Sequence, residues 1–275
     1  MSITPEAIKH IGKMSHVPEF LEQLAKADTK SQLILVPDGF QVNDLEGHQE
    51  NRNSLRGNFK TPVIAEFVKY GSKFIGDAAK TFIDVESMSA RTIFDLGDTA
   101  KAGHQRHKAT LQLRKTAPFK ILLGRDGRAA HQREMAEWLE DNTEFLQAFD
   151  GNGEVIEMSR AIAAVRELSF EHKRGRESNV QNFAESQSEY ESIATKTRED
   201  LVLPHVFVFT CIPYQGLESF RFELRVSIKG ADTINLRIKN LEAMEEKIAQ
   251  HFLELLQKTF EDEEIEQPLF IGEWN

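Results

Sequence analysis

Three carboxylates come nearest to a catalytic pattern in this chain. Asp84 and Glu86 lie two positions apart in the stretch Phe82-Ile83-Asp84-Val85-Glu86, and Asp95 belongs to the next apolar stretch. Carboxylates on neighbouring strands can hold Mg²⁺ for the cleavage of a phosphodiester bond. A Lys beside the carboxylates often completes such a site, and the nearest match here, Glu223-Leu224-Arg225, has none. Since alternating charge is also ordinary on the solvated side of a strand, we assign no metal and no cofactor and keep the three acids as candidates.

A second set of residues is basic and suits contact with an anion, a nucleic acid or another subunit. Residues 101–128 carry eight Lys or Arg against one acid, Asp126, which is a net charge of +7. A smaller basic cluster occupies residues 172–176. Screening confines a charged patch to about 10 Å, so a local basic face can act in an acidic protein. The candidate contact residues are Arg106, Lys108, Arg114, Lys115, Lys120, Lys173, Arg174 and Arg176.

Other catalytic signatures do not occur in the sequence. It has no Gly-rich phosphate loop, no dinucleotide-binding fingerprint and no nucleophile elbow. His104 and His107 are three positions apart, but they lie in a predicted loop or strand start with Arg106 between them, which disfavours a metal site. Cys211 lies within an apolar stretch and is predicted to be a buried packing residue. We therefore expect a protein without enzymatic activity, while the three acids keep that question open.

The composition limits the class of protein. The 275 residues include 44 acidic and 34 basic side chains, for a formal charge of −10, together with 19 Phe. Such a chain is expected to be globular and soluble rather than disordered. No window of about 18 residues is free of charge and no signal pattern opens the sequence, so we expect neither a membrane nor secretion but the cytoplasm. The net acidity disfavours a bulk nucleic-acid binder, and a single Cys excludes an internal disulfide.

The spacing of apolar residues predicts the elements that carry these groups. Residues 1–29 are expected to form two short helices, and residues 30–150 a first half of strands and helices. In that half, Thr61 is predicted to cap a helix that has Pro62 at its first position. Its other predicted elements are a strand at 33–36, a hairpin of 81–86 with 91–96, two strands within 105–123 around Pro118, and a helix at 130–149.

A second half of the same kind is predicted for residues 151–275. It begins with a helix at 154–165 and continues with the polar stretch 168–198, which suits long edge strands or an exposed arm. Blocks of helices and alternating strands indicate an α+β fold, with antiparallel sheets in two strand-rich halves and amphipathic helices flanking them. The two halves could also form one continuous domain. The elements predicted after the polar stretch are strands at 206–212, 221–228 and 234–238, a helix at 241–260 and a strand at 269–271.

Charge is distributed unevenly over these elements. The basic segment 101–128, predicted as a hairpin, is followed by residues 129–157 with a net charge of −7, and residues 241–266 also carry −7. Three arrangements fit this pattern. The basic segment packs against the acidic helix inside the fold, or opposite charges meet between subunits, or the basic segment binds an anion or nucleic acid.

Several stretches, in a fixed order along the chain, carry a resemblance to a known family. They are residues 56–59, 67–70, 81–84, 107–113, 117–120, 132, 136–142, 222–226 and 268–272. In this order they resemble the YfdQ-like family of phage and prophage proteins, a domain of unknown function, over residues 30–272. The resemblance implies a phage or prophage origin and a location in the cytoplasm of the bacterial host. It transfers no catalytic residue.

Two functions from different classes fit these observations. The first is a non-enzymatic phage accessory protein that self-associates into a homo-oligomer through its opposite charges and the stretch 168–198. The alternative is a nucleic-acid-associated protein of phage DNA metabolism, either a binder that uses the basic residues or a metal-dependent nuclease that uses the three acids. A third function has a host protein as partner, with the acids of 129–157 and 241–266 imitating DNA to inhibit a host defence system.

Overall fold

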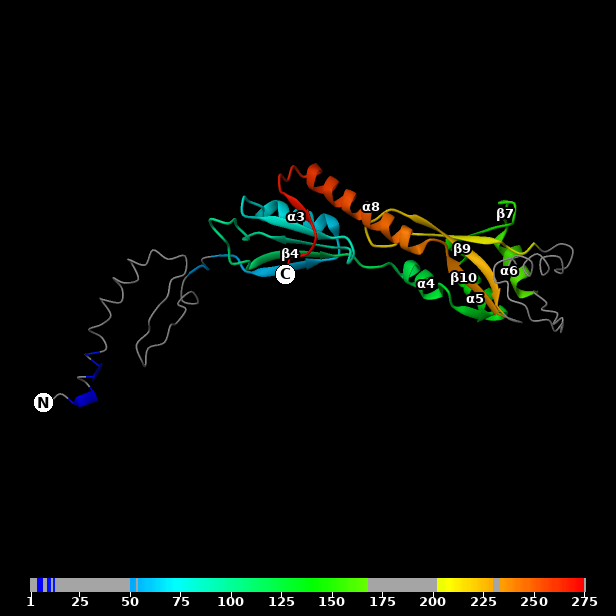
Figure 1. Ribbon diagram of the computed structural model, residues 1–275, viewed down its shortest axis with the longest axis horizontal. Coiled ribbons are helices and arrows are strands. Elements are labelled where there is room, and N and C mark those ends of the chain that lie inside the picture. The colour runs from blue at the N-terminus through cyan, green and yellow to red at the C-terminus, as the bar shows by residue number, and fades with distance from the viewer. Residues whose placement is uncertain are drawn as a thin grey trace, which may run out of the picture. The chain divides into compact units, whose positions relative to one another are not determined.

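The computed structural model describes residues 4–6, 9–10, 12, 50–52, 54–167, 202–229 and 233–274 (Figure 1). The chain divides into two compact units, Met1–Leu55 and Arg56–Asn275, and the helices and strands below belong to the second unit. In the first unit, residues 5, 6, 9, 10 and 12 are helical. The strand predicted at 33–36, the polar stretch 168–198 and the basic cluster 172–176 lie outside the described residues.

Five strands form the first sheet. In the order in which they lie side by side, they are β1 (Gly57–Thr61), β4 (His107–Gln112), β3 (Ser89–Ile93), β2 (Lys80–Asp84) and β11 (Leu269–Ile271). β1 with β4 and β2 with β11 run parallel, whereas β2 with β3 and β3 with β4 are antiparallel. The β2–β3 pair confirms the predicted hairpin.

Helix α3 (Ile64–Phe74) packs against this sheet. It buries Ile64, Phe67 and Val68, which lie on one face of the helix. The helix begins later than predicted, because Thr61 is the last residue of β1 and Val63 is the N-cap. The Thr61 hydroxyl oxygen accepts a hydrogen bond from the Val63 N–H at 3.1 Å. Thr61 therefore still satisfies a backbone donor just before the helix.

The second sheet has six strands, and every pair in it is antiparallel. In spatial order they are β5 (Ala129–His131), β10 (Thr233–Ile238), β9 (Phe220–Lys229), β8 (Val206–Cys211), β6 (Leu146–Phe149) and β7 (Val155–Ile156). The strands β8, β9 and β10 lie close to the bounds predicted for them, because each has a clear run or alternation of apolar residues.

Helices flank both sheets. In the second, Phe119 lies 5.4 Å from Phe222 between ring centroids, and Trp138 lies 6.2 Å from Phe209. The helices there are α4 (Ala117–Arg125), α5 (Gln132–Asp141) and α6 (Met158–Arg166). Helix α8 (Leu241–Asp262) contacts α3 (Figure 1). The fold is therefore α+β, as predicted.

One predicted element near Pro118 is wrong. Pro118 lies not between two strands but in the first turn of α4, where Thr116 is the N-cap. The Thr116 hydroxyl oxygen accepts a hydrogen bond from the Phe119 N–H at 3.3 Å. Proline suits the first turn, since N–H groups there have no partner within the helix. The segment 101–128 thus contains a strand and a helix rather than a hairpin.

The helix predicted at 130–149 also ends early. Helix α5 stops at Asp141, a 3-10 turn (Thr143–Phe145) follows, and the next four residues are strand β6. Leu146 and Ala148 are buried while Gln147 is exposed, which is the alternation of a strand. Pairing with β8, far along the sequence, fixes this conformation.

One hydrophobic core runs through both sheets. It includes Ile83 of β2, Phe209 of β8 and Phe252 of α8, each fully buried. Strands from both sides of residue 150 share each sheet, since β6 pairs with β8 and β2 with β11. The predicted division into 1–29, 30–150 and 151–275 stays a prediction. Among the described helices, none has the length and apolar character needed to cross a membrane.

Candidate nucleic-acid interface

The three candidate carboxylates lie at separate points around the β2–β3 hairpin. Asp84 ends β2 and pairs with Ser89, whereas Asp95 follows β3 at the opposite end of the hairpin. Glu86 is exposed in the turn between the strands. Within the described ranges, no three His, Cys, Asp or Glu side chains are grouped to hold a metal ion. The geometry therefore does not bring these acids together.

Two of these acids accept hydrogen bonds from backbone N–H groups instead. The Asp84 carboxylate accepts hydrogen bonds from the N–H groups of Glu86 at 3.0 Å and Ser87 at 3.3 Å. A bond from the Ser87 hydroxyl, together with these backbone bonds, keeps the pKa of Asp84 below its usual value despite partial burial. Asp95 accepts in the same way from Arg106 at 2.9 Å and His107 at 3.1 Å. Both carboxylates therefore fix loops at the ends of strands.

Two other reactive side chains lie in the interior. Burial raises the pKa of the Cys211 thiol to about 12, so the thiol stays protonated at neutral pH. This confirms the prediction of a buried packing residue. His107 is buried and shares a hydrogen bond of 2.9 Å with the Tyr70 hydroxyl. Burial lowers the pKa of His107, and the charge of Asp95 offsets part of that effect.

The basic candidates divide into groups. Arg106, Lys108 and Arg114 lie on β4 or directly beside it. Lys115, the residue after Arg114, has its amino group 5.8 Å from the centre of the Phe119 ring, and Lys120 is exposed on α4. Lys173, Arg174 and Arg176 lie outside the described residues.

The predicted contact between basic and acidic segments exists at one point. Arg125 of α4 forms an ion pair of 3.3 Å with Glu134 of α5. Arg106, Lys108, Arg114 and Lys120 form no ion pair within the part of the chain that the structure describes. Their charges are thus open to a ligand.

The face of the first sheet opposite α3 has no described helix on it, and we call it the open face. Side chains alternate along a strand, and directly paired residues share a side. Ile83, Ala90 and Ala109 belong to the buried core beneath α3, so their strand neighbours point away from it. The open face comprises Asn58 and Lys60 of β1, Lys108, Thr110 and Gln112 of β4, Ser89, Arg91 and the buried Ile93 of β3, Lys80, Phe82 and Asp84 of β2, and Phe270 of β11.

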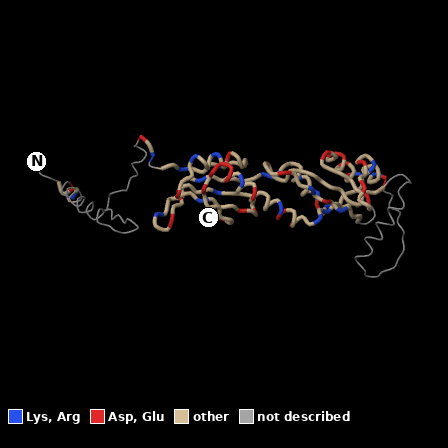
Figure 2. Tube along the Cα trace, turned by 90° about the horizontal axis from the view of Figure 1, so that it is seen from above, with Lys and Arg blue, Asp and Glu red and all other residues tan. Residues whose placement is uncertain are grey.

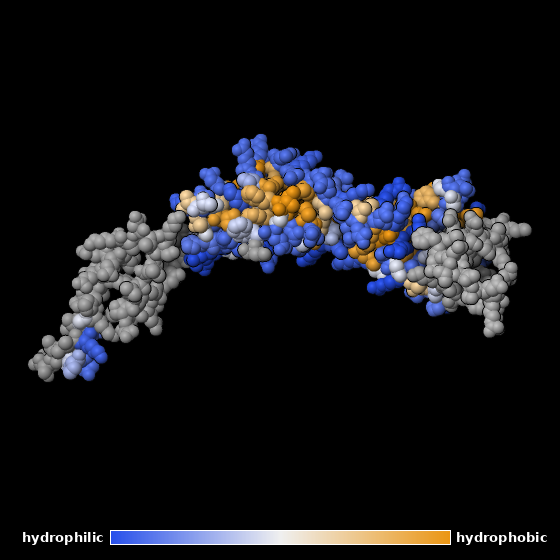
Figure 3. Space-filling model, viewed as in Figure 1, coloured by the Kyte–Doolittle hydropathy of each residue, from blue (hydrophilic) through white to orange (hydrophobic). Residues whose placement is uncertain are grey.

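Three aromatic rings stack on the open face. The Phe82 centroid lies 5.4 Å from that of Phe270 and 5.1 Å from that of Trp274. Arg91 donates to the Trp274 backbone carbonyl at 2.8 Å, and the Trp274 indole N–H donates to the Gln105 side chain at 3.2 Å. Phe270 is 45% exposed and Trp274 is 38% exposed. Figure 3 shows hydrophobic surface over the part of the molecule where Figure 1 draws α3, β11 and α8. Such an aromatic row is a platform on which flat rings stack.

Basic side chains share the open face with the aromatic row. Lys60, Lys80, Arg91 and Lys108 lie on the open face, against a single acid, Asp84, among its strand residues. Figure 2 marks Lys and Arg in blue along the chain, interspersed with acids. None of these four cations has an ion pair with a described acid. The arrangement combines cations for phosphates with rings for bases.

The aromatic row was not predicted. Phe82 and Asp84 were recognised as part of an alternating strand, and Phe270 as part of the last strand. Both strand segments show an alternating pattern, which predicts the side of its own strand on which each residue lies. It does not reveal that β11 pairs with β2, and this pairing is what brings the rings together.

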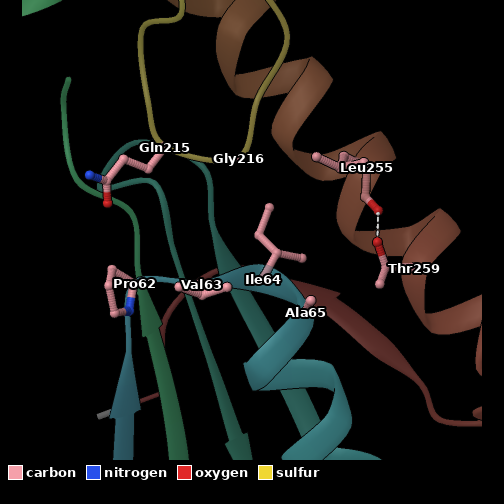
Figure 4. Close-up of a pocket in the computed structure, with 8 residues that line it drawn as sticks. All are labelled: Pro62, Val63, Ile64, Ala65, Gln215, Gly216, Leu255 and Thr259. Carbon is pink, nitrogen blue, oxygen red and sulfur yellow. Dashed lines mark hydrogen bonds between the residues drawn. The ribbon is translucent and has the colours of Figure 1, made fainter.

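Away from the open face, the surface has an apolar hollow whose lining contains no reactive group (Figure 4). It lies between the start of α3, the loop at 215–216 and α8, with a volume of about 270 Å³. The Thr259 hydroxyl donates to the Leu255 carbonyl at 2.7 Å, so the hydroxyl is already engaged. Its lining residues are Pro62, Val63, Ile64, Ala65, Gln215, Gly216, Leu255 and Thr259.

Comparison with known proteins places the chain in a family. A family model described as an uncharacterized conserved protein (DUF2303) matches residues 1–274. No curated protein and no solved structure matches the chain significantly. The family match spans both compact units and includes every residue of the open face. The chain therefore belongs to the family of uncharacterized conserved proteins DUF2303.

Proposed function

We propose that this protein is a non-enzymatic accessory protein of phage or prophage DNA metabolism that binds a single strand of nucleic acid on the open face. The row of Phe82, Phe270 and Trp274 beside Arg91 and Lys108 carries the proposal. Every base has a flat π-face, so exposed rings bind single strands with little dependence on sequence. Lys and Arg beside the rings hold the phosphates.

A single strand fits the open face better than a duplex. Bases in a duplex stack on one another and show the protein only their edges in the grooves. An α-helix or two-stranded ribbon that enters a groove is the usual reader of those edges, and the open face is a broad sheet surface. Five strands spaced by about 4.8 Å give a surface about 19 Å wide, which accommodates a few nucleotides.

Fluorescence anisotropy with labelled oligo(dT) of about 15 nucleotides, at about 50 mM salt, tests the proposal. We expect binding, and we expect Phe270→Ala to weaken it by about five- to hundredfold, since stacking one base contributes about 1–3 kcal/mol. Phe270 is 45% exposed on an edge strand, so its loss leaves the core intact. Val155→Ala is the matched control, because Val155 is an exposed apolar residue on β7, at the edge of the second sheet.

Charge variants test the same surface independently. Lys108→Gln should reduce the slope of log affinity against log salt by about 0.7, the value for one phosphate contact on a single strand. Lys120→Gln on α4 should leave the slope unchanged. The proposal fails if no oligonucleotide binds, or if Val155→Ala and Lys120→Gln lower affinity as much as the variants of the open face.

The phage or prophage origin and the host cytoplasm are part of this proposal. They rest on the resemblance to the YfdQ-like proteins over residues 30–272, a range that lies within the family match. Fractionation of host cells that express the chain tests the location. We expect the protein in the cytoplasmic fraction, and recovery with membranes or outside the cell would contradict it.

We also propose self-association into a homo-oligomer as a second function. Its support is the presence of strand edges that no described strand pairs with, on β1 in the first sheet and β7 in the second. At β7, Val155 is 70% exposed. Strand edges with unpaired N–H and C=O groups pair readily with a second chain. Light scattering at micromolar concentration, in low and in physiological salt, decides the question, and a strict monomer in both would exclude it.

A further inference from the structure

The open face contains a hollow beside the ends of β2 and β3, with a volume of about 250 Å³. Phe82 and Trp274 line the hollow together with the polar side chains of Asp84, Arg91 and Gln112. The Gln112 amide donates to the Ser87 carbonyl at 2.7 Å, which fixes the Gln112 side chain. Aromatic rings together with hydrogen-bonding groups suit a single flat heterocycle.

Phosphate binding can account for the cations near this hollow but not for its acids. Asp84 and Glu273 both border it, and a carboxylate repels the phosphates of a strand. Both backbone bonds of Asp84 end on Oδ1, and the same carboxylate also has side-chain hydrogen bonds with Ser87 and Glu273. The hydrogen bonds that lower the pKa of Asp84 also keep its carboxylate ionised at neutral pH, as an acceptor. The ligand of this hollow must therefore present hydrogen-bond donors.

Guanine is the base that complements this hollow. Its Watson–Crick edge has two neighbouring donors, the N1–H and the N2 amino group, and its other edge has the acceptors O6 and N7 that Arg binds. The other three bases place an acceptor next to their donor on the Watson–Crick edge, and a carboxylate repels that acceptor. Guanine alone therefore offers Asp84 two bonds.

The positions of Asp84 and Arg91 also fit one base. Arg91 pairs directly with Phe82, and Asp84 lies two positions further along β2. Such diagonal neighbours are about 7–8 Å apart, so the two side chains can reach different edges of a base. Arg91 gives one N–H group to the Trp274 carbonyl, and no bond from its other N–H groups to a described residue is present, so they can serve a ligand.

We propose that this hollow binds one guanine base of the strand, stacked on Phe82 and Trp274. Asp84 accepts hydrogen bonds from the N1–H and the N2 amino group, and Arg91 donates to O6 and N7. This inference rests on the proposed function, since the strand delivers the base, and it adds a sequence preference to that function.

Anisotropy with oligo(dT) strands that carry one central dG, deoxyinosine or dA tests the preference. We expect the dG strand to bind about tenfold more tightly than plain oligo(dT), as for a good bidentate pair. Deoxyinosine lacks the N2 amino group and should lose part of that gain. Asp84→Asn retains an acceptor for the turn and should abolish the preference while still binding oligo(dT). Glu86→Gln, which removes the same charge from the exposed turn, should keep the preference.

Two outcomes overturn the guanine site while the proposed function stands. They are equal affinities for all four strands, and a preference for dG that survives in Asp84→Asn. Failure of every strand to bind would instead overturn the proposed function, and free nucleotides then test the hollow alone. 5′-GMP should quench the fluorescence of Trp274, one of two Trp in the chain, more than 5′-AMP does. Trp274→Phe and Asp84→Asn should each remove that difference, and equal quenching by both nucleotides overturns the site.

Discussion

His107 shows how burial changes the chemistry of a single residue. It is 7% exposed, and its ring lies 4.5 Å from that of Phe94 and 5.1 Å from that of Phe74. The Tyr70 hydroxyl is its hydrogen-bond partner at 2.9 Å. Burial disfavours the imidazolium ion and lowers the pKa of His107, although Asp95 opposes this. The two histidines of the His-x-x-His pattern therefore differ in environment. His104 is exposed, whereas His107 lies among aromatic side chains in the core.

The lowered pKa of His107 predicts a loss of stability in weak acid. In the unfolded chain the imidazole takes up its proton near pH 6.5, whereas the folded chain takes it up at lower pH. The unfolded state binds more protons in that window, so the free energy of unfolding falls as the pH drops below about 6.5. We expect the urea midpoint to fall between about pH 7 and about pH 5.5, and to fall less in His107→Gln. His104→Gln should behave like the parent, and an equal fall in His107→Gln would contradict the assignment.

Residue types alone gave the right chemistry for some side chains and the wrong one for others. The apolar stretch around Cys211 correctly predicts burial, because hydrophobic neighbours exclude water wherever the strand lies. The spacing of Asp84, Glu86 and Asp95 suggests a metal site, yet the hairpin places Asp84 and Asp95 at its opposite ends. Convergence of side chains is a property of strand register, which sequence spacing does not contain.

At the scale of elements, helix α4 depends on its first turn. Thr116 accepts a hydrogen bond from the Phe119 N–H, and its hydroxyl donates to the Ile212 carbonyl. Thr116→Ala removes both bonds, so we expect a loss of about 1–2 kcal/mol in the free energy of unfolding, measured by urea denaturation. Thr116→Ser keeps the hydroxyl and should lose far less. Equal stability of the Ala variant and the parent would show that Thr116 does not cap the helix.

Most elements were predictable because their apolar residues repeat with the period of a helix or a strand. Helix α8 and the strands β8, β9 and β10 are examples, and each is long or strictly alternating. The failures at α4 and β6 have different causes. At α4 the Thr116–Pro118 start signal is present in the sequence, but a proline between two apolar stretches also suits a break between strands. At β6 four residues are too few to show a period, and pairing with β8 determines that they form a strand.

At the scale of the whole molecule, the open face is assembled from distant parts of the chain. Its strands come from residues 57–61, 80–93, 107–112 and 269–271. The alternating or apolar residues of 80–93, 107–112 and 269–271 predict strands there, whereas no strand is predicted at 57–61. Their neighbours could not be predicted, because β1 with β4 and β2 with β11 are parallel pairs without a connecting turn.

The net charge of the molecule predicts an unusual salt dependence for strand binding. At about 0.1 M salt the screening length is about 10 Å, so a strand on the open face senses mainly the nearby cations. At about 0.01 M it reaches about 30 Å, and the net charge of −10 then repels the strand. We therefore expect affinity to pass through a maximum at intermediate salt. Replacing Glu263 and Glu264 together by Gln should move that maximum to lower salt, and a steady rise in affinity down to the lowest salt would contradict the prediction.

The parallel pairing of β11 with β2 has a consequence for the order of events during translation. β2 leaves the ribosome long before its partner at residues 269–271 is made. Until then β2 has no strand paired along the edge that β11 occupies in the folded protein. Phe82 also has neither Phe270 nor Trp274 to stack on. Contacts between segments so far apart form slowly. The nascent chain therefore cannot display the aromatic row, and the binding surface arises only when synthesis has passed Trp274.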